Sequence, residues 1–311
     1  MAGHVVFGTG PLGLAVMRAL VADGERVCMV NRSGQAAVPS GVEVARADVF
    51  DAMKLREICA GASVVYQCAT PPYHKWPELF PPLQGVILEA AAEAEATLVI
   101  AENLYAYGDS NGRSLTDDLP LTARTRTGRT RAMMTAQALE AHREGRVRVA
   151  IGRGSDFFGP HVLRSAMGER VFVPALRGRS ASSLGNIDLP HTYTFISDFG
   201  KALVLLGKHN EALGRAWHVP NPETVSTREF LTMVFEELGL PPKMTTVGPA
   251  MLHFAGVFSS GAREMGEMMY QFAKPFVVDS TAFEQSFGVR GTPLREAIRQ
   301  TIDWYRKRGG E

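Results

Sequence analysis

Short apolar runs alternate with longer amphipathic segments over the first half of the chain. The run SVVYQC at residues 63–68 is largely apolar, which is typical of a strand buried on both faces of a parallel sheet. Segments with apolar residues three and four positions apart predict helices between such runs. The predicted strands are residues 4–7, 26–30, 42–45, 63–68, 97–101 and 147–152, and the predicted helices are residues 12–22, 51–59, 77–96 and 130–142. This alternation predicts an α/β fold with a doubly wound parallel sheet and right-handed crossovers.

The pattern changes after Arg153, where the loops lengthen and helices follow one another. The helices expected there are residues 198–207, 226–238, 250–258, 262–272 and 293–306. They predict a smaller, mostly helical C-terminal lobe that covers the ligand edge of the sheet. We therefore expect two domains, residues 1–153 and residues 154–311, with part of the second domain returning to the sheet.

Composition narrows the class of protein. Of the 311 residues, 45% are hydrophobic and 21% are charged, as in ordinary globular proteins. The net charge of +1 gives no field that would attract a polyanion, so we expect no nucleic acid and no membrane as partners. The three cysteines lack metal-ligand spacing, so no metal is expected, and sparse thiols favour a reducing compartment. With no leader or membrane-spanning stretch expected, we predict a cytoplasmic protein.

The segment VVFGTGPLG at residues 5–13 carries the strongest chemical signal. Its three glycines form G-x-G-x-x-G between a predicted strand and a predicted helix. The first glycine permits a tight turn, the second lets a pyrophosphate approach the backbone, and the third lets the helix pack on the strand. The helix N-terminus adds amide donors and partial positive charge. A glycine turn without a ligand is the alternative, but this context favours a Rossmann dinucleotide-binding domain. The residues expected on the phosphates are Gly8, Thr9, Gly10, Pro11, Leu12 and Gly13.

The second predicted strand ends in VNRSG, and this ending bears on the choice of cofactor. A domain that binds NAD normally offers an acidic side chain here to the ribose 2′-hydroxyl, whereas this chain offers Asn31, Arg32 and Ser33. An arginine can pair bidentately with a 2′-phosphate and stack on the adenine, and a serine can donate a hydrogen bond. A solvated loop arginine is the alternative. The sequence favours NADP(H) as the cofactor.

Two further strand ends are expected at the cofactor. Asp48, with the neighbouring backbone at Val49, can hold the adenine amino group, or Asp48 can cap the following helix. Cys68, Ala69 and Thr70 follow the fourth strand, where ligands lie in open α/β sheets.

Nearly the whole chain resembles the extended short-chain dehydrogenase/reductases, the epimerase/dehydratase-like group. The resemblance rests on several motifs of that family. They are GTGPLG, the acidic Asp48, CAT where the family often has H-A-A, NLYAYG (103–108) for S-S-x-x-V-Y-G, RGSDFFGP (153–160) for R-P-x-x-x-Y-G-P, ISDFGKAL (196–203) for V-x-D-x-A-x-A, and the final segment 287–306.

This resemblance implies a catalytic Ser or Thr, Tyr and Lys, and all three positions differ here. Alignment on the Y-G pair puts Asn103 at the serine, Thr127 at the tyrosine and Arg131 at the lysine. Asn103 can donate to a carbonyl oxygen, and Arg131 can bind ribose hydroxyls of the cofactor. Thr127 cannot replace the tyrosine, because an aliphatic hydroxyl is far less acidic than a phenol. The resemblance therefore implies an atypical member.

Three other residues are candidate proton sources. If the segment after residue 102 stays extended, Tyr105 points to the same side as Asn103, because side chains alternate along a strand. His191 and Tyr193 fall where the family's second lobe covers the substrate, although a packing role is equally open.

Two surface features have weaker interpretations. Arg124, Arg126, Arg129 and Arg131 can bind an anion, but a solvated face is the commoner explanation. The aromatic segment 71–82 can line an apolar pocket or cap the sheet.

We therefore expect an NADP(H)-dependent oxidoreductase acting on a small carbonyl, alcohol or activated double bond. Alternatives are an epimerase, dehydratase or lyase that uses bound cofactor, and a non-catalytic NADP(H)-sensing protein. The expected partner is a small-molecule substrate, and the family resemblance also allows a homodimer through paired helices.

Overall fold

The computed structural model describes residues 3–247 and 266–309. The chain divides into two compact units, each assembled from three segments. Unit 1 comprises residues 1–106, 121–154 and 199–219, and unit 2 comprises residues 107–120, 155–198 and 220–311. The helix predicted at residues 250–258 and the beginning of the one at 262–272 lie outside the described residues.

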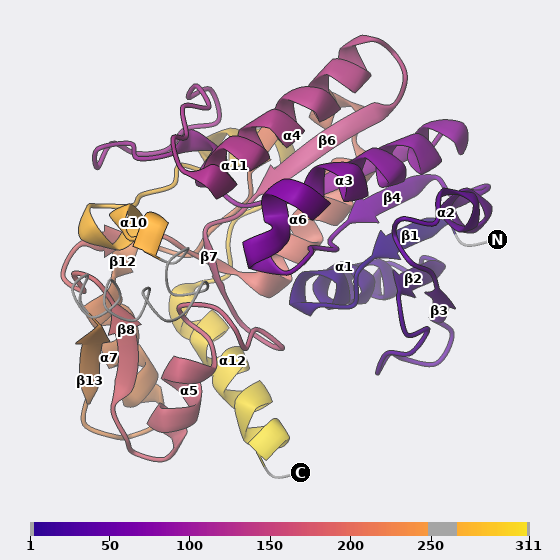
Figure 1. Cartoon of the computed structure of the whole chain (residues 1–311). Coiled ribbons are helices and arrows are strands. Elements are labelled where there is room, and N and C mark those ends of the chain that lie inside the picture. Colours follow the sequence, from indigo (N-terminus) through magenta and orange to yellow (C-terminus); the bar gives the residue numbers. More distant parts are fainter. Residues whose placement is uncertain (1–2, 248–265, 310–311) are drawn as a thin grey trace. The chain divides into compact units, whose positions relative to one another are not determined.

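Unit 1 is built on a seven-stranded sheet in the order β11-β6-β5-β4-β1-β2-β3 (Figure 1). Every neighbouring pair in this sheet is parallel, which confirms the predicted doubly wound architecture. The strands are β1 (His4–Phe7), β2 (Val27–Asn31), β3 (Glu43–Arg46), β4 (Val64–Gln67), β5 (Thr97–Glu102), β6 (Arg148–Arg153) and β11 (Ala216–His218). The edge strand β11 comes from the late part of the chain and pairs with β6.

Helices cover both faces of this sheet, because residues on a strand alternate between faces and each face here is apolar. On one face, a continuous core joins side chains from the strands to α2, α3 and α4. On the other face lie α1 and α6: a Cβ on Gly200 of α6 would lie 2.7 Å from the Cβ of Ala15 in α1. The helices are α1 (Pro11–Ala22), α2 (Ala52–Cys59), α3 (Trp76–Glu93), α4 (Arg126–Arg143) and α6 (Ile196–Lys208), with short helices η1 (Tyr73–Lys75), η2 (Tyr105–Tyr107) and η3 (Asn210–Ala212).

Unit 2 packs its helices around a second apolar core, which includes α5, α7 and α12. It also contains three two-stranded ladders that the sequence analysis did not predict. These strands are two to four residues long and partly polar, as in ASSL and MTTV, so they carry little periodic signal. The helices are α5 (Glu169–Leu176), α7 (Thr227–Glu237), α10 (Tyr270–Ala273), α11 (Thr281–Phe287) and α12 (Leu294–Gly309), and the ladders pair β7 (Asp156–Phe158) with β10 (Tyr193–Phe195), β9 (Pro190–His191) with β12 (Val225–Ser226), and β8 (Ala181–Leu184) with β13 (Met244–Val247).

No helix within residues 3–247 and 266–309 is both long and apolar enough to cross a membrane.

Candidate functional site

The glycine turn between β1 and α1 has the geometry of a phosphate cradle. Gly8 has a φ of +102°, and a Cβ there would lie 2.8 Å from the backbone nitrogen of Ala69. A Cβ on Gly13 would lie 1.9 Å from the carbonyl oxygen of Gly8, so only glycine lets the helix approach the turn. Gly10 is different, because no heavy atom lies within 4 Å of its Cβ position. The backbone therefore borders open space where a pyrophosphate would approach.

The N-terminus of α1 has no side-chain cap, because its cap residue, Gly10, has no side chain. Pro11 occupies the first turn. The first amides of a helix have no intrahelical acceptor, and the helix dipole adds partial positive charge there. These features fit a dinucleotide pyrophosphate, which would be held by the backbone between Thr9 and Gly13.

The loop after β2 is organised by the Asn31 side chain. Its Nδ2 donates to Thr9 Oγ1 at 3.0 Å and to the Gln35 carbonyl at 2.9 Å. Its Oδ1 accepts from Gly34 N at 2.7 Å and from Ser33 Oγ at 3.0 Å. Asn31 therefore fixes the loop to the glycine turn, and the Ser33 hydroxyl is directed inward to Asn31. Sequence reasoning missed the contact between Asn31 and Thr9, which are 22 residues apart.

Arg32 projects from this ordered loop and is exposed. No ion pair joins its guanidinium to a carboxylate among the residues that the structure describes. The position at the end of β2 therefore presents a positive charge where NAD-binding domains present an acid.

The end of β3 lies beside the end of β2, and the end of β4 borders the glycine turn. Asp51, not Asp48, caps α2 by accepting from Lys54 N at 3.1 Å, so the capping alternative for Asp48 is wrong. The Asp48 carboxylate accepts instead from Phe50 N at 3.1 Å, and Val49 packs on the core. After β4, Ala69 lies against Gly8, and Thr70 is exposed.

Cys68 also follows β4 and is half-buried. Desolvation raises the pKa of its thiol to about 12, so the group is a neutral thiol at neutral pH. It can line a cofactor site, but it is not a nucleophile as it stands.

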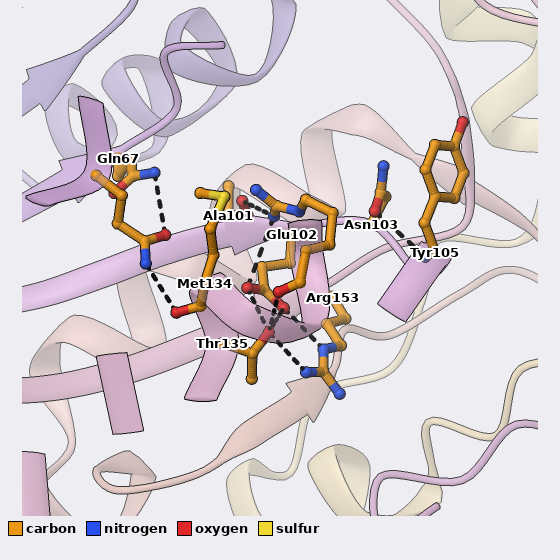
Figure 2. A network of polar contacts seen from close by, with 10 residues as sticks. Gln67, Ala101, Glu102, Asn103, Tyr105, Met134, Thr135 and Arg153 are labelled. Atoms are coloured by element: carbon orange, nitrogen blue, oxygen red, sulfur yellow. Dashed lines mark hydrogen bonds and ion pairs between the residues drawn. The ribbon is translucent and has the colours of Figure 1, made fainter. Parts of the chain in front are cut away.

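The chain turns after β5, and the expectation of an extended segment at Asn103–Tyr105 is wrong. Asn103 Oδ1 accepts from Tyr105 N at 3.2 Å, and residues Tyr105–Tyr107 form the short helix η2. Asparagine commonly caps its own backbone two residues on, which competes with extended structure. Figure 2 shows the amide nitrogen of Asn103 directed away from the Tyr105 backbone. The Asn103 amide N–H groups donate no hydrogen bond to another described residue, so both remain available as donors.

The half-buried Tyr105 packs in an aromatic cluster with Tyr73 and Trp76. Its ring centroid lies 6.3 Å from that of Tyr73 and 6.1 Å from that of Trp76. Trp76 and Phe80 are themselves in the core, with 8% and 1% of their surface exposed. The aromatic segment 71–82 thus caps the sheet with part of its length, and Tyr73 and Tyr105 form its partly exposed side.

Arg131, at the lysine position, lies in a buried polar network with Glu102 and the Ala101 carbonyl. Its Nη2 donates to the Ala101 carbonyl at 3.1 Å and lies 3.7 Å from Glu102 Oε1. Its guanidinium carbon lies 4.7 Å from the ring centroid of Phe80, and its Nε and Nη1 make no hydrogen bond within the described residues. Burial lowers the pKa of Arg131, partly offset by Glu102. With 2% of its surface exposed, Arg131 points into protein, and its role toward the ribose stays a prediction.

Glu102 is the centre of this network, and sequence reasoning missed it. Its Oε2 accepts from Arg153 Nε at 3.0 Å, and the Thr135 hydroxyl lies 2.8 Å from its Oε1. Figure 2 shows its carboxylate between Thr135 and Arg153. The only signal in the sequence is an acid that ends the largely apolar run TLVIAE.

Thr127, at the tyrosine position, is also buried and lies in the first turn of α4.

The four arginines between residues 124 and 131 do not act as one basic cluster. Arg126 pairs with Glu78, and Arg129 donates to the Arg124 carbonyl at 3.0 Å. Arg131 is buried, as described above. This arrangement favours the solvated-face interpretation for Arg124, Arg126 and Arg129.

In unit 2, His191 and Tyr193 are enclosed. His191 Nε2 lies 2.8 Å from Asp156 Oδ2, and its ring stacks on Phe272 at 5.0 Å. The Tyr193 hydroxyl lies 2.6 Å from Thr227 Oγ1, and burial raises the pKa of that phenol. Each side chain is 3% exposed, which favours the packing role over proton delivery.

A hollow of about 340 Å³ in unit 2 borders the start of α5. Arg164 and Arg170 line it together with Leu163 and Leu184. Burial lowers the pKa of Arg170, yet an arginine stays charged at neutral pH. Glu169 also lines the hollow, so its lining carries charges of both signs.

No group of His, Cys, Asp or Glu side chains in the described parts of the chain is arranged to hold a metal ion.

Comparison with known proteins identifies one matching family model and many solved structures that share the fold of this chain. Residues 5–219 match the model of the NAD dependent epimerase/dehydratase family. No curated protein sequence matches the chain. A nucleoside-diphosphate-sugar epimerase from Pseudomonas aeruginosa superimposes with a TM-score of 0.78 at 17% identity, covering 98% of both chains.

Two further solved structures show the same fold. A double mutant of the dTDP-glucose 4,6-dehydratase DesIV from Streptomyces venezuelae, with NAD bound, gives a TM-score of 0.79 at 17% identity, over 99% of this chain and 98% of that one. The UDP-N-acetylglucosamine 4-epimerase from Bacillus cereus gives 0.78 at 15% identity, over 98% and 97% of the two chains.

Proposed function

We propose that this chain, which belongs to the NAD dependent epimerase/dehydratase family, is an NADP(H)-dependent oxidoreductase acting on a small carbonyl, alcohol or activated double bond. The observation that carries the choice of cofactor is the loop after β2, which holds Arg32 exposed and without an ion pair among the described residues. A 2′-phosphate on the adenosine ribose would give this guanidinium a bidentate partner, whereas a 2′-hydroxyl would leave it without one.

Different segments of unit 1 would bind different parts of the cofactor and the substrate. The backbone from Gly8 to Gly13 would hold the pyrophosphate, and the ends of β2 and β3 would hold the adenosine. When bound, a reduced nicotinamide supplies a hydride to an electrophilic carbon. Asn103, through its free amide N–H donors, would then hold the substrate oxygen as negative charge develops on it.

The proton for that oxygen needs a separate source. Tyr105 is the candidate that the geometry supports best, because it follows Asn103 closely and is only half-buried. His191 and Tyr193 are each only 3% exposed. Arg131 is close enough to Tyr105 for the phenol to raise the pKa of the guanidinium.

A second candidate is an epimerase, dehydratase or lyase that uses bound cofactor transiently. The family name and the solved structures named for epimerases and a dehydratase favour it. A third candidate is a non-catalytic NADP(H)-binding protein, which the changed residues at positions 103, 127 and 131 favour.

The test is turnover with NADPH and a panel of aldehydes, ketones, quinones and enones. Oxidation of NADPH is followed by its absorbance. Steady turnover supports the oxidoreductase, and tight NADPH binding without turnover on any substrate supports the binding protein. A matched control is Gly10→Val, because that Cβ meets no protein atom within 4 Å and would occupy the space of the pyrophosphate. Turnover that persists in Gly10→Val would contradict the assignment of the cofactor site.

A further inference from the structure

We propose that Arg46, at the end of β3, is a second cation for the 2′-phosphate of NADP(H) and sets cofactor specificity together with Arg32. This inference rests on the NADP(H) preference in the proposed function, and it adds a residue that the sequence motif does not include. It follows from the register of β2 and β3, the packing of the loop after β2, and the charge of the ligand.

The register places Arg46 beside the loop. Asn31 and Arg46 are direct partners in the β2–β3 ladder, and the Ala47 amide donates to the Asn31 carbonyl at 3.0 Å. Partners in a parallel ladder point to the same face of the sheet. Arg46 therefore leaves the sheet on the same face as Asn31, whose side chain organises residues 31–35.

The loop lies directly on Arg46. Gly34 has a φ of +69°, and a Cβ there would lie 2.8 Å from the Cβ of Arg46. Glycine is thus required twice, for its backbone conformation and for this contact. The Arg46 side chain starts within contact distance of a residue two positions after Arg32.

Arg46 is exposed and carries an uncompensated charge. Neither Arg32 nor Arg46 forms an ion pair with a carboxylate in the described part of the chain, and neither has a side-chain hydrogen bond there. The first acid in the chain after Arg46 is Asp48, whose carboxylate accepts from Phe50 N. Two unpaired guanidinia at adjacent strand ends repel each other unless an anion lies between them.

The charge of the ligand matches this pair. A phosphate monoester carries about −1.5 to −2 at neutral pH, so one arginine leaves roughly half of that charge unbalanced. Arg32 and Arg46 together supply two positive charges and planar donors for separate phosphate oxygens. A 2′-hydroxyl offers neither guanidinium a charged partner.

Calorimetric titration of the full chain tests this assignment, with 2′,5′-ADP and NADPH as ligands that carry the phosphate, and 5′-AMP and NADH as ligands that lack it. Arg46→Ala should weaken binding of 2′,5′-ADP and NADPH about tenfold, the low end for a charge-assisted hydrogen bond, and leave 5′-AMP and NADH within about twofold. Arg46→Lys should recover part of the loss. Arg143→Ala, which removes an exposed arginine in the last turn of α4, is the matched control and should change none of the four affinities.

The outcomes separate this inference from the function on which it rests. Unchanged NADPH affinity in Arg46→Ala, with a loss in Arg32→Ala, overturns the role of Arg46 and leaves the NADP(H) preference standing. An equal loss of NADPH and NADH affinity in Arg46→Ala also overturns it, because that pattern belongs to a residue that only supports the fold. Equal affinities of the wild-type protein for NADPH and NADH would contradict the cofactor choice itself.

Discussion

Replacing Glu102 by glutamine removes one negative charge from between two buried arginines. Arg153 Nε lies 3.0 Å from Glu102 Oε2 and Arg131 Nη2 lies 3.7 Å from Oε1, and all three side chains are almost fully enclosed. At an effective dielectric constant of about 20, charges at these separations attract by about 5 kcal/mol each before desolvation is counted. Glu102→Gln keeps the shape and one acceptor oxygen but removes the negative charge that both guanidinia contact.

We expect Glu102→Gln to lower the free energy of unfolding by about 3–5 kcal/mol, the range for breaking a buried pair by removing one partner. Urea unfolding followed by circular dichroism measures this value. The matched control is Glu57→Gln, which breaks the exposed pair between Lys54 and Glu57 and should change stability by less than about 0.5 kcal/mol.

A double-mutant cycle separates the ion pair from general damage to the core. In the Glu102→Gln/Arg153→Met variant, both members of the 3.0 Å pair are gone, so the total loss should be smaller than the sum of the two single losses. A Glu102→Gln protein within about 1 kcal/mol of the wild type, or strictly additive losses in the cycle, would refute the interpretation of this network as a coupled set of charges.

Three further substitutions test the site. Arg32→Asp should abolish or reverse the preference for NADPH over NADH in calorimetry, because a carboxylate repels a 2′-phosphate and accepts from a 2′-hydroxyl; an unchanged ratio would contradict the role of Arg32. Arg131→Ala should weaken NADPH binding by about 1.5–3 kcal/mol if the guanidinium reaches the ribose, and an unchanged affinity would confine Arg131 to the buried network. With a working substrate and saturating cofactor, Tyr105→Phe should lower turnover about a hundredfold or more, the effect of losing a general acid, whereas His191→Ala and Tyr193→Phe should preserve proton transfer. Unchanged turnover in Tyr105→Phe would leave water or unit 2 as the proton source.

The fold was predictable because its signals are local. Each signal is formed by residues that are close together in the sequence. Examples are the periodicity of a strand or helix, the glycines between β1 and α1, and the apolar run at β4. The edge strand β11 and the three ladders of unit 2 carry a weaker signal, because most of these strands have only two or three residues and the longer ones, ASSL and MTTV, are largely polar.

The part of the site that is formed by neighbouring residues in the sequence was predictable. The cradle at residues 8–13 and the exposed Arg32 could be inferred from a motif. The network around Glu102 joins residues 33 and 51 positions apart, so it depends on the packing of α4 and β6 against β5. The position of Arg46 beside the loop after β2 follows from the β2–β3 register, which the sequence motif does not give.

The turn at Asn103 shows a different reason for error. The alternation of Asn103 and Tyr105 depends on an extended segment, but the asparagine side-chain oxygen accepts a hydrogen bond from the backbone N–H two residues on. That local hydrogen bond competed with extended structure and rotated Tyr105 out of the expected alternation. The tyrosine nevertheless remains at the partly exposed side of the aromatic cluster, so its candidacy rests on exposure rather than on strand geometry.

The choice of NADP(H) can be tested without knowledge of the substrate, by calorimetric measurement of the affinity of the unmodified protein for NADPH and for NADH under the same conditions. We expect NADPH to bind at least tenfold more tightly, a difference of about 1.4 kcal/mol that a single charge-assisted contact at the 2′-phosphate can supply. Equal affinities, or tighter binding of NADH, would contradict it.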